Sequence, residues 1–375
     1  MMSDWSLRDK NCIVGVGTTE WGVFPETDCY EMGLRALQTA VSECGIKWSE
    51  IDGLIVNRIP SYERLAEMAN LNLRYCITTP GEGRYAGISL MLACQAIASG
   101  DAEVVALVYG NDGKSAGVKY GGATGPWGPW LPWGFTSPGA IHAMMFKRHM
   151  YEFGTSSEDL APIAMTFRDH ALRCPGAVMN KPITSEDYWN SRFICEPLRL
   201  YDYCLINDGG VALIVTSAER ARDLIKPPTY ISGYARSDTF DGSAFPKTDY
   251  WYPILQEVAG KVYQRANIDQ DAVSGLMIYD NFTPTVLFSL EGLGFCKQGE
   301  GGEFIREGNL ALDGGRWPTN TTGGHLSESY MQGWGLLAEA VRQCRRECGD
   351  RQISDCEVVQ YVCATNLSVS FLFRR

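Results

Sequence analysis

Two tyrosines stand at positions where their phenols would be placed for proton transfer. Tyr279 closes the apolar run "GLMIYD" (275–280), and Tyr330 lies in "GGHLSESYMQGWG" (323–335), where a glycine pair leads toward an expected helix start. A phenol has a pKa near 10, so it carries protons at neutral pH only if its surroundings lower that value. The sequence thus leaves two roles open for each tyrosine, packing or proton transfer.

Other polar residues near these tyrosines are secondary candidates for the same site. His325 belongs to the second stretch, and it is expected to be catalytic or a plain loop residue. Asp280 ends the first stretch and Asn281 follows it; they could orient the phenol or donate to an oxyanion. Asp208, in "NDGG", is expected to fix a turn before a strand.

A tryptophan-rich loop is the other chemically distinctive stretch. "GGATGPWGPWLPWGFTSPG" (121–139) holds three indoles between prolines and glycines, at Trp127, Trp130 and Trp133. Aromatic side chains are enriched both in apolar pockets and in protein interfaces. We expect this loop to contact an apolar substrate or a partner protein.

Composition excludes several classes of protein. The 375 residues carry a net charge of −11, which disfavours nucleic-acid binding because that needs a basic face. No apolar run reaches the roughly 18 residues of a membrane span, and the N-terminus lacks a secretion signal. The 13 cysteines show no CxxC spacing. We therefore expect a cytoplasmic protein with free thiols and no metal site.

Two pairs of segments indicate an internal duplication. "VSECGIKWSEIDGLIV" (41–56) and "YQRANIDQDAVSGLMI" (263–278) share a helix end, a turn and a strand. "ACQAIASGDAEVVALVYGN" (93–111) and "AVRQCRRECGDRQISDCEVVQYVCATN" (340–366) share a helix, a glycine stop and a strand. Because both pairs occur in the same order, duplication is the better explanation.

Continuous apolar runs that alternate with helices predict an α/β fold whose strands are covered on both faces. We expect an N-terminal half over 1–225, with a long insertion at about 112–208, and a C-terminal half over 226–375. Strands are expected at "CIVGVG" (12–17), "GLIVN" (53–57), "VVALVYG" (104–110), "VALIVTS" (211–217), "GLMIYD" (275–280) and "VVQYVCA" (358–364).

Four longer motifs make the chain similar to a known superfamily. They are "KRHMYEFGTSSEDLAPIA" (147–164), "PLRLYDYCLINDGGVALIVTSAERARDL" (197–224), "LEGLGFCKQGEGGEF" (290–304) and "EAVRQCRRECGDRQI" (339–353). They resemble the sterol-carrier, or lipid-transfer, branch of the thiolases. The resemblance implies a duplicated five-layered αβαβα fold with an insertion in the first half, normally dimeric. His149, in the first motif, is expected to be a hydrogen-bonded structural residue.

Three positions depart from the thiolase pattern. The nucleophilic cysteine should open the helix that ends at residue 99, yet Gly83 stands there, and Tyr85 follows it as an aromatic donor. A strand-end motif with Asn or His reads "YDNF", and the Gly-His-Pro motif reads "SYMQG", with Tyr330 replacing histidine. Cys363 lies near the place of a late catalytic cysteine, but its context favours a structural role. Without a thiolate, Claisen cleavage has no acyl acceptor.

This combination resembles the thiolase-like aldolases of steroid side-chain degradation. It implies retro-aldol cleavage of a β-hydroxyacyl-CoA, with no cofactor bound in this chain and coenzyme A arriving as the substrate thioester. It also implies a homodimer joined to a DUF35-type partner, an OB-fold and zinc-ribbon protein, as a heterotetramer. Gly83 then offers its backbone N–H to the oxyanion, and Lys147 and Arg148 are expected to contact the phosphates.

Two other functions remain open at this point. One is a partner-dependent thiolase or acyltransferase that acts on a bulky or aryl acyl-CoA, although the missing nucleophile disfavours it. The other is a catalytically inactive, acyl-CoA-binding scaffold subunit. Detection of a covalent acyl-enzyme would favour the first, and binding without cleavage would favour the second.

Overall fold

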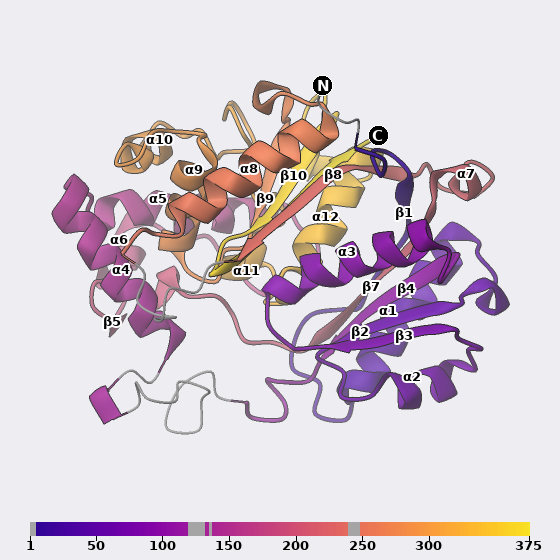
Figure 1. Cartoon of the computed structure of the whole chain (residues 1–375). Coiled ribbons are helices and arrows are strands. Elements are labelled where there is room, and N and C mark those ends of the chain that lie inside the picture. The colour runs from indigo at the N-terminus through magenta and orange to yellow at the C-terminus, as the bar shows by residue number, and fades with distance from the viewer. Residues whose placement is uncertain (1–4, 119–131, 135–136, 239–247) are drawn as a thin grey trace.

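The order of strands in one half of the sheet is repeated in the other half. The computed structural model describes residues 5–118, 132–134, 137–238 and 248–375, whose strands form a sheet of nine, ordered β3-β2-β4-β7-β1-β8-β11-β10-β9 (Figure 1). These strands are β1 (Asn11–Thr18), β2 (Gly53–Asn57), β3 (Tyr75–Thr79), β4 (Val104–Asn111), β7 (Gly209–Ser217), β8 (Thr229–Asp238), β9 (Gly275–Ile278), β10 (Val358–Cys363) and β11 (Leu367–Arg374).

The two half-sheets mirror one another in pairing. β2 runs parallel to β4, and β4 runs antiparallel to β7; likewise β9 runs parallel to β10, and β10 runs antiparallel to β11. The halves meet where β1 pairs with β8 through Cys12 with Tyr230 and Ile13 with Thr229. This repeat is the duplication that the sequence predicts, while the division of the chain at residue 225 stays a prediction.

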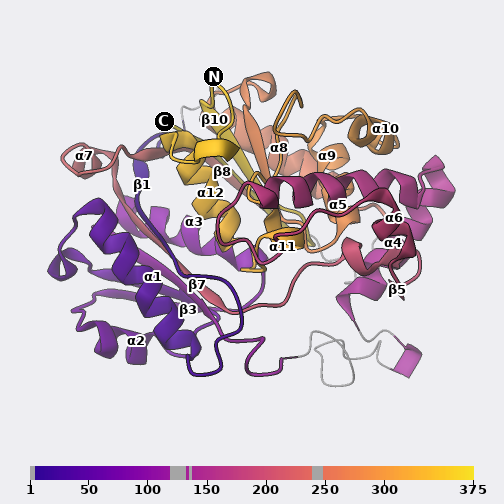
Figure 2. The same cartoon turned by 180° about the vertical axis from the view of Figure 1, so that it is seen from behind.

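Helices complete five layers. α1 (Cys29–Cys44) contacts β1, β4 and β7, and α8 (Tyr252–Ala266) contacts β8 and β11, so these helices form the outer layers. α3 (Arg84–Ser99) and α12 (Trp334–Arg345) each contact strands of both half-sheets, and therefore form the middle layer (Figures 1 and 2). The expected αβαβα arrangement is confirmed. Both middle helices are largely buried because sheets cover them on two sides.

Helix ends follow the predicted duplication with one difference. Gly45 after α1 and Asn267 after α8 both adopt the left-handed conformation that ends a helix. Gly100 does the same after α3, but α12 ends at Arg346, with φ of 61°, rather than at the predicted Gly349. Arg346 accepts this strained conformation because its N–H still bonds to carbonyls of the last helical turn.

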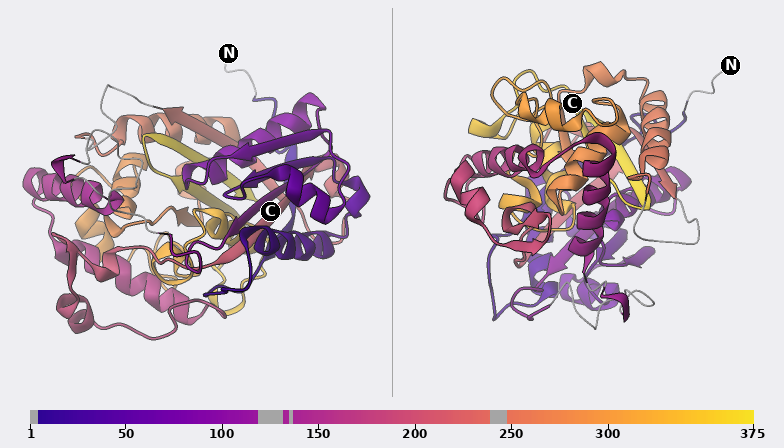
Figure 3. Two further views of the ribbon diagram at one scale, coloured as in Figure 1. Left: turned by 90° about the horizontal axis from the view of Figure 1, so that it is seen from below. Right: turned by 90° about the vertical axis from the view of Figure 1, so that its left-hand side faces the viewer.

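The described elements between β4 and β7 gather at one end of the molecule (Figures 1 and 3). They are α4 (Pro138–Phe153), α5 (Ser157–Leu172), α6 (Ser185–Asn190), β5 (Phe193–Cys195), β6 (Leu198–Arg199) and the turn η3 (Leu200–Asp202). The remaining helices are α2 (Tyr62–Ala69), α7 (Ala218–Ala221), α9 (Thr283–Leu293), α10 (Gly301–Arg306) and α11 (Gly324–Ser327), with short turns η1 (Trp48–Glu50), η4 (Gln270–Ala272) and η5 (Gly349–Arg351). Within the described residues, no helix combines the length and apolar composition that crossing a bilayer requires.

Candidate active site

The two tyrosine hydroxyls lie in direct contact. Tyr279 Oη and Tyr330 Oη are 2.9 Å apart, although 51 residues separate them in the chain. Tyr279 directly follows β9, as predicted. Tyr330 was expected to begin a helix; it lies instead in the loop between α11 and α12, and the helix begins at Trp334. The side chains are 3% and 9% exposed, so Tyr330 is the more accessible of the pair.

Gly83 makes room for the phenol pair. It lies immediately before α3, and a Cβ built on it would come 2.2 Å from the ring and hydroxyl of Tyr279. Since real Cβ atoms are never so close, a cysteine at this position would displace that ring. Residues 83 and 279 are therefore sterically linked: the phenol occupies the space that a side chain at residue 83 would fill.

Burial sets the protonation of Tyr279. Its surroundings raise its pKa well above the usual value, first by desolvation and then through Tyr330 and the nearby Cys363. The condition that the sequence sets for a phenolic base, a lowered pKa, is therefore not met at Tyr279. In the resting protein Tyr279 is a neutral phenol, which suits it to donate a hydrogen bond or a proton.

His325 packs against both phenols. Its ring lies 4.7 Å from that of Tyr279 and 5.2 Å from that of Tyr330, in edge-on contact with each. Its Nε2 accepts a hydrogen bond from the Gly333 N–H at 3.0 Å, and its Nδ1 lies 3.1 Å from Asp280 Oδ1. The expected proximity of this histidine to the tyrosines is therefore observed.

Asp280 and Asn281, which follow Tyr279, bind other elements. Asn281 accepts a hydrogen bond from the Thr285 hydroxyl at 2.8 Å, which places its amide at the first turn of α9. Asp280 accepts from the backbone N–H groups of His325 and Leu326, at 2.9 and 3.3 Å. Asp280 thus holds α11 against the end of β9, and no contact of Asn281 supports its predicted catalytic role.

A segment at residues 204–208 joins the loops that carry the two phenols. The Cys204 N–H bonds to the Asn281 carbonyl at 3.0 Å, and the Leu205 N–H bonds to the His325 carbonyl at 2.9 Å. The Tyr330 N–H donates to Asn207 Oδ1 at 2.8 Å. Asp208 accepts from the N–H groups of residues 24, 114 and 115, so it ties the start of β7 to the loops that follow β1 and β4.

Sequence reasoning missed two residues that hold the site together. Asn207 binds the backbone of Tyr330, as described above. Gln332 adopts a left-handed backbone, with φ of 49°, and donates to the Gly81 carbonyl at 2.8 Å, which ties the tyrosine loop to the turn before α3. A non-glycine residue in this conformation is often functional, but sequence alone does not reveal φ.

Two thiols lie near the phenols, and neither is activated. Burial raises the pKa of Cys363 to about 12 and also raises that of Cys204 above its usual value. Thiol chemistry requires the thiolate, and these groups hold their protons at neutral pH. Cys363, fully buried at the end of β10, is structural, as the sequence indicates.

The structure describes some of the residues that were predicted to contact substrate or coenzyme A. Trp127 and Trp130 lie outside the described residues, and Trp133 is 81% exposed. Lys147 is exposed on α4, where Arg148 pairs with Glu152 one turn away. Tyr85, partly buried in the first turn of α3, contacts Arg84 through its ring. The coenzyme A contacts of all these residues stay predictions.

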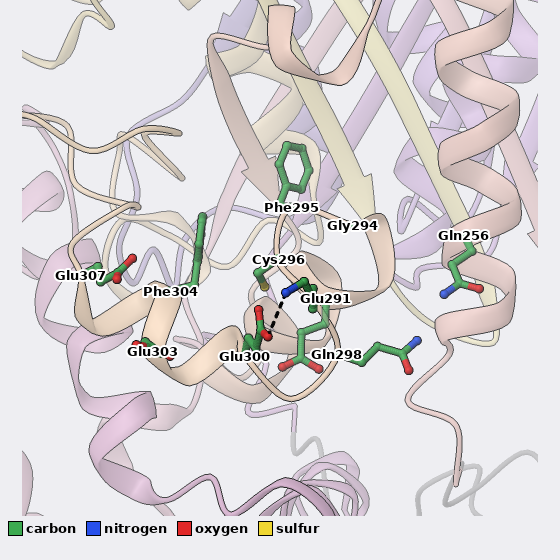
Figure 4. A pocket seen from close by; sticks show the side chains of 11 residues that line it. Gln256, Glu291, Gly294, Phe295, Cys296, Gln298, Glu300, Glu303, Phe304 and Glu307 are labelled. Atoms are coloured by element: carbon green, nitrogen blue, oxygen red, sulfur yellow. Dashed lines mark hydrogen bonds and ion pairs between the residues drawn. The ribbon is translucent and has the colours of Figure 1, made fainter.

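A polar cavity of about 880 Å³ lies apart from the phenols, between α8, α9 and α10 (Figure 4). Glu291 at its wall binds His149 Nε2 at 3.1 Å and the Tyr252 hydroxyl. Burial alone would raise the pKa of Glu291, but these hydrogen bonds lower it below its usual value. His149 also bonds to Thr155 at 2.8 Å, so it is the structural histidine that we expected.

The fold and the site define a duplicated, five-layered α/β protein in which two buried phenols meet beside Gly83. A family model described as thiolase C-terminal domain-like matches residues 243–365. A steroid side-chain-cleaving aldolase of Thermomonospora curvata is 36% identical over 90% of this chain and 91% of its own length. The 17-hydroxy-3-oxo-4-pregnene-20-carboxyl-CoA lyase of Mycobacterium tuberculosis is 33% identical over 90% and 92%.

A solved structure agrees with these relatives. The Ltp2–ChsH2(DUF35) aldolase superimposes with a TM-score of 0.90 at 34% identity, covering 98% of each chain. The chain therefore belongs to the thiolase superfamily, in the branch of the side-chain-cleaving acyl-CoA aldolases. It is a carbon–carbon lyase of thiolase fold.

Proposed function

We propose that this protein cleaves a β-hydroxyacyl-CoA with a steroid-type side chain by a retro-aldol reaction, together with a DUF35-type partner. The contact of 2.9 Å between the two phenols, in the space that Gly83 leaves, is the observation that supports this most directly. The names of the relatives supply the substrate class, and the DUF35 protein in the structural relative supports the partner. A homodimeric core within a heterotetramer is part of the same proposal.

The reaction needs a base, an oxyanion donor and an acid. The substrate β-hydroxyl gives its proton to the base, the Cα–Cβ bond breaks, and its electron pair enters the thioester as an enolate while Cβ becomes a carbonyl carbon. A proton then returns to Cα, so the products are a ketone or aldehyde and a shorter acyl-CoA. No covalent enzyme intermediate forms, and so the absence of an activated thiol is compatible with this chemistry.

The phenols are assigned different roles. Tyr279 keeps its proton because burial raises its pKa, and it serves as the hydrogen-bond donor to the oxygen of Tyr330. Tyr330 is the more exposed phenol, and a hydrogen bond from Tyr279 stabilises its oxygen when that oxygen is anionic. Tyr330 is therefore the base, and the backbone N–H groups at the start of α3 are the candidate donors to the enolate oxygen.

The proposed function is tested with the complex. The protein is co-expressed with a DUF35-type partner and incubated with a steroid β-hydroxyacyl-CoA, and the products are followed by mass spectrometry. We expect a ketone or aldehyde and a shorter acyl-CoA, while the matching acyl-CoA without the β-hydroxyl stays intact. Binding of substrate without cleavage would indicate a scaffold subunit, and a covalent acyl-enzyme would indicate a thiolase.

A further inference from the structure

His325 is anchored on both of its ring nitrogens. The Gly333 N–H donates to Nε2 at 3.0 Å, so Nε2 carries no hydrogen and the proton of the neutral ring sits on Nδ1. Nδ1 faces Asp280 Oδ1 at 3.1 Å, at an angle that is poor for a hydrogen bond but favourable for the charge of the carboxylate. A cationic ring would also carry a hydrogen on Nε2, and this N–H would point at the Gly333 N–H, so the hydrogen bond between them would be lost.

The anchors connect the segments that carry the phenols. Asp280 directly follows Tyr279, and Gly333 lies three residues after Tyr330, at the start of α12. The imidazole, 1% exposed, fills the space between these segments and touches both phenol rings edge-on. Its position therefore determines how the two rings lie relative to one another.

We propose that His325 is a positioning residue: it holds the two phenols in their reactive arrangement and takes no proton from the substrate. The inference rests on the proposed function and assigns to His325 a role other than the catalytic one that the sequence suggests. A proton acceptor needs a free nitrogen lone pair, and the single lone pair of this ring is occupied by the Gly333 N–H. Asp280 supports the same tautomer from the other side.

The first test is independent of turnover. The chain has four histidines, so the ¹⁵N ring signals of labelled wild-type protein can be assigned by comparison with His325→Gln. We expect the signals of residue 325 to show the proton on Nδ1 and none on Nε2. A cationic ring, or a proton on Nε2, would overturn the proposal even if the substrate class were wrong.

The second test uses activity of the complex. His325→Gln keeps an acceptor for the Gly333 N–H, and we expect kcat within about tenfold of wild type with the same shape of pH profile. His325→Phe keeps a ring but no acceptor, and we expect kcat to fall about 100-fold through displaced phenols. Equal losses in both variants, with one limb of the pH profile missing, would identify a proton carrier. If His325→Phe does not fold, the glutamine variant and the ring signals still decide.

Discussion

At the scale of single residues, the site depends on steric fit as well as on reactive groups, because the Tyr279 ring fills the space beside Gly83. Gly83 has no side chain because the ring of Tyr279 fills that space, and the phenol is thereby brought to Tyr330. The sequence identifies both tyrosines and the glycine, but it does not show that two of them are sterically linked. That link depends on the close approach of α3 to the end of β9, which only the fold supplies.

Removing either hydroxyl tests the assignment of roles. Tyr330→Phe and Tyr279→Phe should fold normally and lower kcat/KM by about 100-fold or more, the usual contribution of general acid–base groups. In Tyr279→Phe the remaining phenolate loses its donor, so activity should recover partly as pH rises; in Tyr330→Phe it should not. Tyr151→Phe, on a side chain that is 91% exposed, is the matched control. Wild-type rates in both site variants would contradict the mechanism.

A methyl group at Gly83 tests the shared volume. Gly83→Ala should cost about 1–3 kcal/mol of folding free energy, as overpacking does, and should lower activity by displacing the Tyr279 ring. Gly260→Ala is the control, because a Cβ there meets no atom within 4 Å. In a Tyr279→Ala background the cost at residue 83 should largely disappear. Additive costs in urea unfolding would show that the two positions are independent.

At the scale of elements, burial decides which strands the sequence reveals. The six predicted strands are continuous apolar runs, and each corresponds to a strand of the sheet. β3, β8 and β11 were not predicted: β3 is a partly exposed edge strand, and the other two contain buried serines such as Ser232 and Ser370. The Ser370 hydroxyl donates to the Tyr361 carbonyl on β10, so this serine can be buried without an unpaired polar group. It therefore interrupts the apolar run in the sequence although the strand is buried.

The loop that carries Tyr330 was harder to predict than the strands. Its glycines and serines suggest a helix start, but α11 ends at Ser327, where N–H groups from other parts of the chain take its carbonyls: Leu205 bonds to that of His325 and Met179 to that of Ser327. Long-range contacts of this kind have no local sequence signal. The tyrosine itself could be predicted, whereas its partners Asn207 and Gln332 could not.

Glu328 in the same loop gives a prediction about pH. Burial, and then the nearby Glu339, raise its pKa from 4.5 to about 7. The folded state therefore holds this proton more tightly than the unfolded state does. The contribution of Glu328 to the free energy of unfolding is fully present below pH 4.5 and falls as pH rises toward 7. Glu328→Gln removes this loss: relative to wild type, it should gain up to about 3 kcal/mol between pH 4.5 and 7 and then level off. Urea midpoints across pH test this, and a constant difference would contradict it.

At the scale of the whole molecule, the middle helices make the two halves depend on one another. α3 and α12 contact strands of both half-sheets, whereas the sheet itself joins the halves at only two residue pairs. The phenols come from the end of β9 and from the loop between α11 and α12, and Gly83 lies immediately before α3. The site therefore exists only while the middle layer is packed between the halves.

Arg345 tests how strongly the halves are coupled. On α12, its guanidinium is 1% exposed; it pairs with Glu43 of α1 at 3.1 Å and donates to the Ile13 carbonyl of β1 at 3.3 Å. Arg345→Ala leaves Glu43 without this partner and should cost about 3–5 kcal/mol, as breaking a buried pair does. Lys261→Ala, which breaks an exposed pair with Glu257, should cost less than about 1 kcal/mol.

The form of the unfolding transition shows whether the two halves unfold together or one at a time. If the middle layer joins the halves and Arg345 is one of its contacts, far-ultraviolet dichroism and tryptophan fluorescence of the Arg345→Ala variant should still change together, at a lower urea concentration, and activity should be lost in the same transition. If the halves were independent, activity would disappear first while most of the helical signal remained. Two separate transitions in the wild type would show that the middle layer does not join the halves into one cooperative unit.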